Sequence, residues 1–236
     1  MVDLHTHILF RFDDGPKTES DSFALVKEMV SGGVTDIAST SHFYSAQMSV
    51  EDFAERRRRR REELDKLLLE NDVKVNIYNA AEVYIDKLIL NHDSIKPLTY
   101  EGTNYILLEI PHGTDDLDEN LDLIEKISSY YNVKPIIAHV ERYDIFFKKP
   151  KNLLRLCDMG CLIQIDADCF LGGMRSRAFA LNAVKDELVD IIASDCHDVV
   201  SRRPNLKEAY DVIEKKVSRE AVERLKENAE SILIKK

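Results

Sequence analysis

Short hydrophobic segments rich in β-branched residues alternate with longer amphipathic segments along almost the whole chain. The short segments predict buried strands, because apolar runs of roughly four to eight residues bounded by turn residues are typical of them. We place these strands at residues 2–5, 35–39, 74–79, 105–110, 135–139, 161–165 and 189–193. The amphipathic segments predict helices at residues 21–30, 54–69, 120–129, 151–159, 175–186, 206–215 and 219–227.

Strands that alternate with helices and are apolar on both faces predict an α/β fold with parallel pairing. A capping box formed by Thr18 and Asp21 is expected to start the first helix, and Gly32-Gly33 to end it. The length of 236 residues suits a small β/α barrel better than two dinucleotide-binding halves. No internal repeat or low-complexity linker interrupts the sequence, so we expect a single domain over residues 1–236.

Five of the seven histidines lie at or just beyond the C-terminal end of a predicted strand: His5, His7, His42, His139 and His197. In a parallel barrel these strand ends meet at one rim, where the βα loops build the active site. Residues i and i+2 of an extended segment point to the same side, so His5 and His7 can reach one cation, as can Asp195 and His197. One such histidine is usually structural, but four strand ends with the same feature indicate a metal site.

Carboxylates extend this pattern. Glu82 and Glu109 lie in or beside otherwise apolar strands. A buried carboxylate needs a positive partner, either an arginine or a metal ion, and a metal ion also accounts for the histidines. Asp14, in the loop Asp13-Asp14-Gly15-Pro16, is either a further ligand or an ordinary turn residue.

The motifs HxH, DDGP, TSH, EVY, LLEI, IIAHVERY and SDCH follow one another in this order over essentially the whole chain. In this arrangement the chain resembles the PHP (polymerase and histidinol phosphatase) superfamily. It is most similar to the bacterial protein-tyrosine phosphatases encoded with capsular and exopolysaccharide genes, a narrower resemblance that rests on HVERY and DDGP. Three segments depart from the family pattern: Ala80-Ala81 before Glu82, Phe43-Tyr44-Ser45, and Asp166-Ala167-Asp168-Cys169. The last two leave the shape of the rim and the substrate preference open.

The resemblance implies a distorted (β/α)7 TIM-like barrel with three metal ions at its C-terminal rim. It implies one ion held by His5, His7, Glu82 and Asp195. A second would be held by Glu82 as a bridge, Glu109 and His139, and a third by Asp14, His42 and His197. Such mixed imidazole and carboxylate ligation suits divalent transition metals, with manganese as the first expectation and iron, cobalt or zinc as alternatives.

Arg142 and Arg202 match family positions that contact the phosphoryl group, where a guanidinium can donate two parallel hydrogen bonds. A surface salt bridge is the alternative for each, and the adjacent Arg203 leaves the register open. Cys196 and Arg202 also have the C-x5-R spacing of cysteine-dependent phosphatases. The intervening residues are bulky and include the anionic Asp198, whereas a phosphate-binding loop needs small residues and a helix N-terminus. We therefore expect a metal-dependent mechanism.

The net charge of −10 argues against a nucleic-acid-binding protein, although a local cationic site can still bind a phosphorylated substrate. Six consecutive arginines, Arg56 to Arg61, are flanked by acidic residues at helical spacing, with Glu55–Arg59 and Arg59–Glu63 as expected pairs. We expect a solvated, salt-bridged helix. A subunit interface is the alternative, which leaves homo-oligomerisation open, and a non-catalytic anion-binding module is the rival function from another class.

The four cysteines lack paired spacing, no apolar run approaches the roughly 18 residues that a membrane span needs, and the start has no secretory signal pattern. We therefore expect a cytoplasmic protein without membrane insertion. The expected activity is metal-dependent hydrolysis of phosphomonoesters, above all of phosphotyrosine on a protein. The resemblance implies a tyrosine kinase that regulates polysaccharide export as the partner, through its flexible tail. A small-molecule phosphatase, such as one for histidinol phosphate, is the alternative.

Overall fold

The computed structural model describes residues 1–113 and 116–233, and every strand pairing in this part of the chain is parallel. The strands are β1 (Val2–Thr6), β2 (Asp36–Ser39), β3 (His42–Phe43), β4 (Asn76–Asn79), β5 (Glu82–Tyr84), β6 (Tyr105–Glu109), β7 (Lys134–Ile137), β8 (Leu162–Asp166) and β9 (Ile191–Ala193). They form a sheet of order β1-β2-β4 and a sheet of order β3-β5-β6-β7-β8-β9. A parallel bridge between Thr6 and Cys196 joins β1 to the segment that follows β9.

The nine strands correspond to the seven that the sequence predicts, because two of the predicted strands continue after a short break. β3 follows β2, and β5 follows β4, with backbone hydrogen bonds from Ala80 N to Ser39 O and from Glu82 N to Thr40 O, both 3.0 Å long. The short continuations β3 and β5 were not predicted, since two or three residues that include His42 and Glu82 give no apolar periodicity. The predicted distorted, seven-stranded α/β barrel is confirmed.

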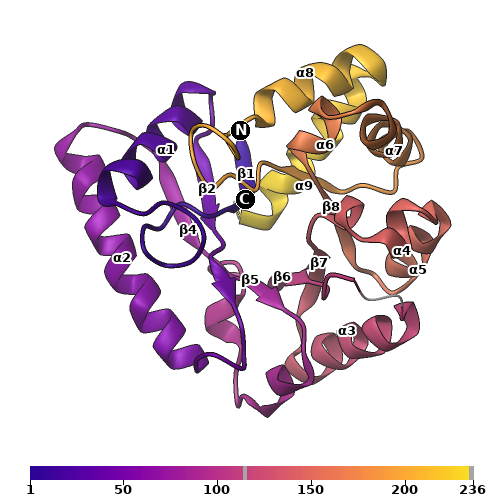
Figure 1. The fold of residues 1–236 in the computed structure, drawn as a ribbon, viewed down its shortest axis with the longest axis horizontal. Helices are drawn as coiled ribbons and strands as arrows, with labels where there is room; N and C mark the ends of the chain where they lie inside the picture. The colour runs from indigo at the N-terminus through magenta and orange to yellow at the C-terminus, as the bar shows by residue number, and fades with distance from the viewer. Residues whose placement is uncertain (114–115, 234–236) are drawn as a thin grey trace.

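Helices surround the strands as an outer ring (Figure 1). They are α1 (Glu19–Ser31), α2 (Val50–Glu70), α3 (Leu117–Tyr131), α4 (Asp144–Phe147), α5 (Leu153–Asp158), α6 (Ala167–Leu171), α7 (Met174–Lys185), α8 (Leu206–Lys216) and α9 (Arg219–Leu233), with 3-10 turns at Lys87–Asn91, Lys96–Leu98, Val140–Arg142 and Pro150–Asn152. The capping box of Thr18 and Asp21 starts α1, and Gly32 ends it, as predicted. The short helices α4 and α6 were missed, because one turn of helix gives no periodic pattern. No helix in the described ranges is long and apolar enough to cross a bilayer.

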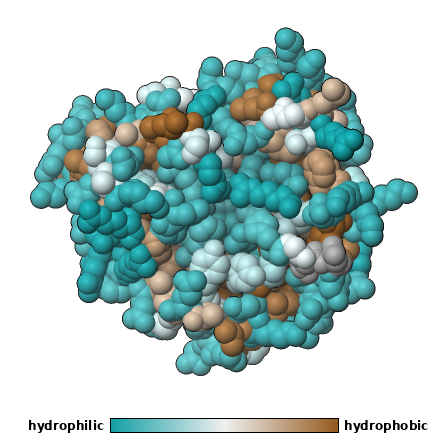
Figure 2. Space-filling model, viewed as in Figure 1, coloured by the Kyte–Doolittle hydropathy of each residue, from teal (hydrophilic) through white to brown (hydrophobic). Residues whose placement is uncertain are grey.

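Two hydrophobic clusters hold the strands and helices together. The larger cluster lies between the strands and the surrounding helices. The smaller one joins Leu4, Leu107 and Ile136 of the strands to Ile232 and Leu233 near the end of α9. Figure 2 shows mainly hydrophilic residues over the centre of the viewed face, with hydrophobic residues scattered toward its edge.

The six arginines of α2 divide into two groups. Arg58 and Arg59 form the expected solvated ion pairs, including Arg59 with Glu55 at 2.8 Å, and Arg61 pairs with Asp65 although only 19% of its side chain is exposed. Glu63 pairs with Arg60 at 2.7 Å, so the expected Arg59–Glu63 pair is wrong: the side chain one turn back at i−3 reaches this carboxylate instead.

The other three arginines hold neighbouring loops. Arg56 donates to the carbonyl oxygens of Arg11 and Phe12, both at 2.8 Å, and Arg60 lies 4.9 Å from the centre of the Phe10 ring. Arg57 is buried and donates to Ala80 O at 2.8 Å. A fully solvated helix is therefore wrong for these three positions, where the arginines fix the loop after β1 and the break before β5.

We expect Arg57→Ala to lower the free energy of unfolding by about 2 kcal/mol, because it removes a hydrogen bond from a charged donor and the packing of the side chain against Phe53. Urea unfolding followed by circular dichroism measures this change. Arg59→Ala is the matched control on the same helix. Its side chain is 68% exposed, and exposed ion pairs contribute little. Equal unfolding curves for the two variants would contradict a structural role for Arg57.

Candidate metal centre

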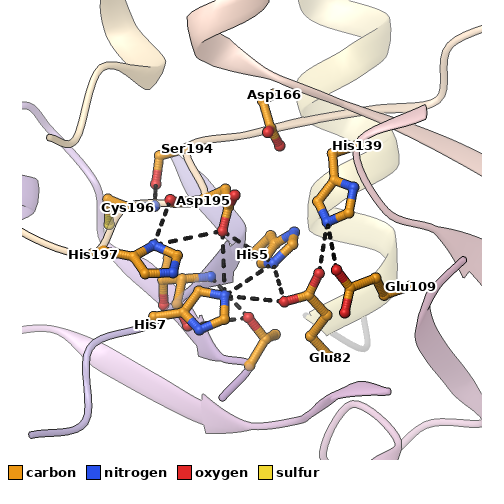
Figure 3. Close-up of polar contacts among 12 residues, drawn as sticks. His5, His7, Glu82, Glu109, His139, Asp166, Ser194, Asp195, Cys196 and His197 are labelled. Atoms are coloured by element: carbon orange, nitrogen blue, oxygen red, sulfur yellow. Dashed lines mark hydrogen bonds and ion pairs between the residues drawn. The ribbon is translucent and has the colours of Figure 1, made fainter. Parts of the chain in front are cut away.

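An irregularity in β1 directs two histidines into the centre of the barrel. The pairing of β1 with β2 shifts its register between Asp3 and Thr6, and such irregularities re-aim side chains next to active sites. His5 lies within this stretch and His7 just after it; their Nε2 atoms are 3.2 Å apart, and both imidazoles are fully buried. Figure 3 shows the two rings converging beside Glu82 and Asp195. The expectation that His5 and His7 face one point is met, whereas Asp195 and His197 fall in different groups of candidate ligands.

These four residues form the first group that could hold a cation. His5 Nε2 lies 3.1 Å from Glu82 Oε2 and 3.3 Å from Asp195 Oδ1. His7 Nε2 lies 3.1 Å and 3.2 Å from the same two oxygens. Asp195 Oδ1 is buried, and no hydrogen-bond donor within residues 1–113 and 116–233 satisfies it. A buried carboxylate oxygen that faces two imidazole nitrogens fits a metal ion between them.

Glu82 also links this group to a second one. Its Oε1 atom lies 2.7 Å from His139 Nε2, and its Oε2 atom lies 3.0 Å from His42 Nδ1. Glu109 approaches both histidines, at 4.0 Å from His139 Nε2 and 3.7 Å from His42 Nδ1. Among the described residues, the buried atoms Glu109 Oε2 and His42 Nδ1 have no hydrogen-bond partner. His42, Glu82 and Glu109 meet the geometry of a cation site, with His139 at its edge.

The third group contains His7, Asp14, His42 and His197. Asp14 Oδ1 lies 3.1 Å from His197 Nε2 and 3.5 Å from His42 Nε2. Asp14 is more than half exposed, so this group forms the outer side of the cluster. Eight of the nine residues selected from the sequence as ligands thus lie in three groups that share His7, His42 and Glu82, and the ninth, His139, contacts Glu82 beside the second group.

The charges of this cluster also fit bound cations. Burial disfavours the charged imidazolium of His5, but the carboxylates of Glu82 and Asp195 raise its pKa to about 9. Burial and the neighbouring charge of Glu82 raise the pKa of Glu109 to about 7. Both shifts have one cause, which is the concentration of carboxylates in a space that excludes water. Divalent ions would neutralise them, and mixed imidazole and carboxylate donors suit transition metals.

The backbone is strained at two of these positions. His139 and Asp195 follow the ends of β7 and β9 with φ angles of 32° and 49°, in the left-handed region that side chains rarely adopt. Such conformations persist where surrounding structure enforces them and are common at functional sites. Here they turn each side chain toward the cluster immediately after the strand.

Residues outside the selected set hold the imidazoles in place. Asp13 Oδ2 lies 2.9 Å from His7 Nδ1 and accepts from the backbone N of His42 at 3.0 Å. Gln164 Oε1 lies 3.2 Å from His5 Nδ1 and accepts from His139 N at 2.8 Å. Sequence analysis missed both, although a glutamine inside an apolar strand was a usable signal. Groups that contact the second nitrogen of a ligand histidine fix its orientation.

The loop that carries Asp13 and Asp14 depends on its glycine. A Cβ atom at Gly15 would collide with the carbonyl oxygen of His7. The motif DDGP therefore combines carboxylates with the small residue that lets this loop pack against β1.

Both selected arginines face the cluster. Arg142 contacts Asp166 Oδ2 at 2.5 Å and also Asp195 Oδ2, which Arg202 contacts as well. Arg202 Nη1 also lies 2.8 Å from His197 Nε2. The side chains are about one-third exposed while Asp166 and Asp195 are buried, so both arginines pair with buried carboxylates, and Arg202 also reaches the exposed Asp14 at 3.4 Å.

Two further residues, Arg203 and His112, lie next to the selected ones. Arg203 points elsewhere and pairs with Glu208 at 2.8 Å, which settles the register left open between Arg202 and Arg203. His112, which sequence analysis did not select, lies 3.3 Å from Glu109 Oε1 and is 55% exposed. No strand-end pattern pointed to it, because it lies in the loop after β6.

Cys196, which follows β9, packs against helix α1. Its sulfur is 3.8 Å from Met29 Sδ in α1, and the residue is fully buried. Burial raises the pKa of its thiol well above the usual range, so the thiolate is disfavoured. The C-x5-R spacing therefore does not form a cysteine-phosphatase loop in this fold.

A parallel β/α barrel with histidine and carboxylate donors gathered at the C-terminal strand ends defines the class of metal-dependent barrel hydrolases. The family model described as capsular polysaccharide synthesis, CpsB/CapC, matches residues 1–234. The chain belongs to this family, which confirms the resemblance seen in its motifs.

Individual relatives cover nearly the whole chain. The tyrosine-protein phosphatase CpsB of Streptococcus pneumoniae is 32% identical, over 99% of this chain and 98% of its own length. The tyrosine-protein phosphatase YwqE of Bacillus subtilis is 31% identical, over 99% of this chain and 91% of its own length.

Solved structures are also similar to this chain, to different extents. A structure described as YwqE from Bacillus subtilis and CpsB from Streptococcus pneumoniae, metal-dependent tyrosine phosphatases, has a TM-score of 0.85 at 28% identity, over 99% of this chain and 94% of that one. The lactonase Lmo2620 from Listeria monocytogenes, at 11% identity and a TM-score of 0.56 over 100% and 95% of the two chains, shares the fold alone.

Proposed function

We propose that this chain is a metal-dependent phosphatase whose substrate is phosphotyrosine on a protein. The observation that carries the proposal is the buried cluster of histidines and carboxylates with Arg142 and Arg202 at its edge. The activity in the names of CpsB and YwqE supports phosphotyrosine as the substrate. We further propose that residues 1–236 act as one catalytic domain, in the cytoplasm.

The donor set supports three bound ions. His5, His7, Glu82 and Asp195 would hold one ion; Glu82, Glu109 and His139 a second; and Asp14, His42 and His197 a third. Manganese is our first choice, with iron, cobalt or zinc as alternatives. When bound, such ions supply Lewis acidity, which lowers the pKa of water from 15.7 toward about 7.

In this proposal the chain's own residues bind the phosphoryl group and orient the metal ligands. Arg142 and Arg202 hold the outer oxygen of Asp195 and leave other N–H groups free to donate to phosphoryl oxygens. Asp13 and Gln164 keep the imidazoles of His7 and His5 turned into the cluster. A tyrosinate leaves with a conjugate-acid pKa of about 10, so it needs less protonation than an alkoxide, and we assign no general acid.

The partner we propose is a tyrosine kinase that regulates polysaccharide synthesis. The family description, capsular polysaccharide synthesis, supports this partner. A flexible, tyrosine-rich tail can approach an open rim as an extended segment, and the exposure of Asp14 and His112 leaves the cluster open on that side.

Metal-loaded protein is expected to hydrolyse a phosphotyrosine peptide with a kcat/KM at least about tenfold above that for a phosphoserine peptide or histidinol phosphate, a difference of about 1.4 kcal/mol in the barrier. The reason is the better leaving group. Strong chelation is expected to abolish all hydrolysis, and Mn²⁺ to restore it. Phosphate release measured for the three substrates on one preparation, with metal content determined, tests both statements.

Cys196→Ser serves as the control, because the thiol contacts Met29 and not the cluster. We expect it to retain most of the activity. Loss of activity in this variant, combined with insensitivity to chelator, would refute the metal mechanism. A kcat/KM for histidinol phosphate tenfold above that for phosphotyrosine would favour the small-molecule phosphatase instead.

A further inference from the structure

Two tyrosines stand beside the metal-ligand candidates on neighbouring strands. His42 of β3 pairs with Glu82 of β5, and Tyr84 of β5 pairs with Glu109 of β6. Tyr84 lies two residues beyond Glu82, so on a regular strand both side chains project from the same side of the sheet. Tyr44 likewise lies two residues beyond His42 and immediately follows β3. The tyrosines therefore continue the rows of His42 and Glu82 toward the rim.

The two rings contact each other and the cluster. Their centroids are 5.4 Å apart with planes tilted by 42°, and the Tyr44 ring lies 5.5 Å from that of His42. Both residues are half-buried. In the described part of the chain, neither tyrosine belongs to a hydrophobic core cluster. The pair thus forms an aromatic surface at the rim that the packing of the core does not require.

The backbone holds this surface in place. Tyr84 is part of the parallel ladder between β3 and β6, and the carbonyl oxygen of Tyr44 accepts the backbone N–H of Gln47 at 2.9 Å in the turn that leads to α2. A ring that is already ordered loses little conformational freedom when it packs against a ligand.

We propose that Tyr44 and Tyr84 form the wall against which the phenyl ring of phosphotyrosine packs, and that they favour aryl over alkyl phosphates. This inference rests on the proposed phosphatase function and assigns its substrate selectivity to two residues. For this contact the ester bond must leave the cluster on the side of His42, whose ring lies 5.5 Å from that of Tyr44. Aromatic pairs prefer offset or edge-to-face contacts at centroid separations of roughly 4.5–7 Å, and two tilted rings offer both. The short side chain of phosphoserine has no ring to make these contacts.

Binding of phosphonates tests the wall without turnover. We would measure by calorimetry the Kd of phenylphosphonate and of methylphosphonate for the metal-loaded protein and for Tyr44→Leu and Tyr84→Leu. We expect the wild type to bind the phenyl compound more tightly, and each variant to weaken its binding about five- to tenfold while methylphosphonate binding and metal content stay unchanged. Tyr44→Phe, which keeps the ring, should restore the preference. Tyr130→Leu, a matched change of an exposed tyrosine on α3, should match the wild type.

Several outcomes would contradict the proposed role of Tyr44 and Tyr84. Equal binding of the two phosphonates by the wild type would do so, as would unchanged phenylphosphonate binding in both leucine variants. A parallel loss for both ligands, or a loss of metal, would assign the tyrosines to the metal centre instead. Failure of the proposed function is measured separately, by hydrolysis. A metal-loaded wild type that does not hydrolyse phosphotyrosine contradicts the phosphatase function, whatever its phosphonate binding.

Discussion

Glu82→Ala is expected to reduce the metal content of the purified protein and to lower kcat for phosphotyrosine hydrolysis by on the order of a thousandfold or more. The two oxygens of Glu82 lie within 3.1 Å of nitrogens from His5, His7, His42 and His139. Loss of this carboxylate removes a donor from two of the proposed ion sites at once. Lewis acidity contributes several kcal/mol to such reactions, which sets the expected size of the effect.

Metal analysis by mass spectrometry, together with steady-state kinetics in excess Mn²⁺, measures both parts of this prediction. Glu125→Ala, on the exposed surface of α3, is the control and should keep wild-type metal content and rate. Thermal unfolding should show that the Glu82 variant is folded. A folded Glu82→Ala protein with wild-type metal content would refute the bridging role.

Arg142→Ala and Arg202→Ala are each expected to lower kcat/KM by about 2–4 kcal/mol of transition-state stabilisation, or roughly thirty- to a thousandfold, as removal of a single oxyanion donor does. Metal content should stay at the wild-type level, because the arginines contact Asp195 through the oxygen that faces away from His5 and His7.

Arg203→Ala is the matched control for this pair. Its guanidinium binds Glu208 outside the cluster, so kcat/KM should change little. If metal content falls together with activity in the Arg142 and Arg202 variants, the arginines act by holding Asp195 and not by binding phosphate. Unchanged kcat/KM in both would remove them from the reaction altogether.

Local patterns in the sequence determined most of the secondary structure and most of the candidate metal ligands of this protein. Periodic hydrophobic residues predicted the seven strand positions and the longer helices, because strand and helix periods are set by neighbouring residues. Polar residues at the ends of apolar strands, such as His139 and Glu109, stood out for the same reason. The narrower motifs HVERY and DDGP also indicated its family.

Other features depended on residues far apart in the sequence. The grouping of His7 with both His5 and His197 depends on closure of the ring between Thr6 and Cys196, and on the shifted register of β1. No local pattern encodes a register shift, because it is fixed by the partner strand. Gln164 stands out as a polar residue in an apolar strand, but its contact with His5, across 159 positions of the chain, follows only from the closed barrel.

The arginines show the same division. The sequence placed Arg202 and Arg203 side by side and could not say which one faces the site, while the structure turns Arg202 toward Asp195 and Arg203 toward Glu208. Helical spacing predicted ion pairs along α2, yet Arg57 is buried against Ala80 because the break between β4 and β5 lies beneath it. Sequence periodicity thus determined which faces are buried, whereas the closed barrel decided which buried and rim residues meet, since only tertiary packing brings distant strand ends to one place.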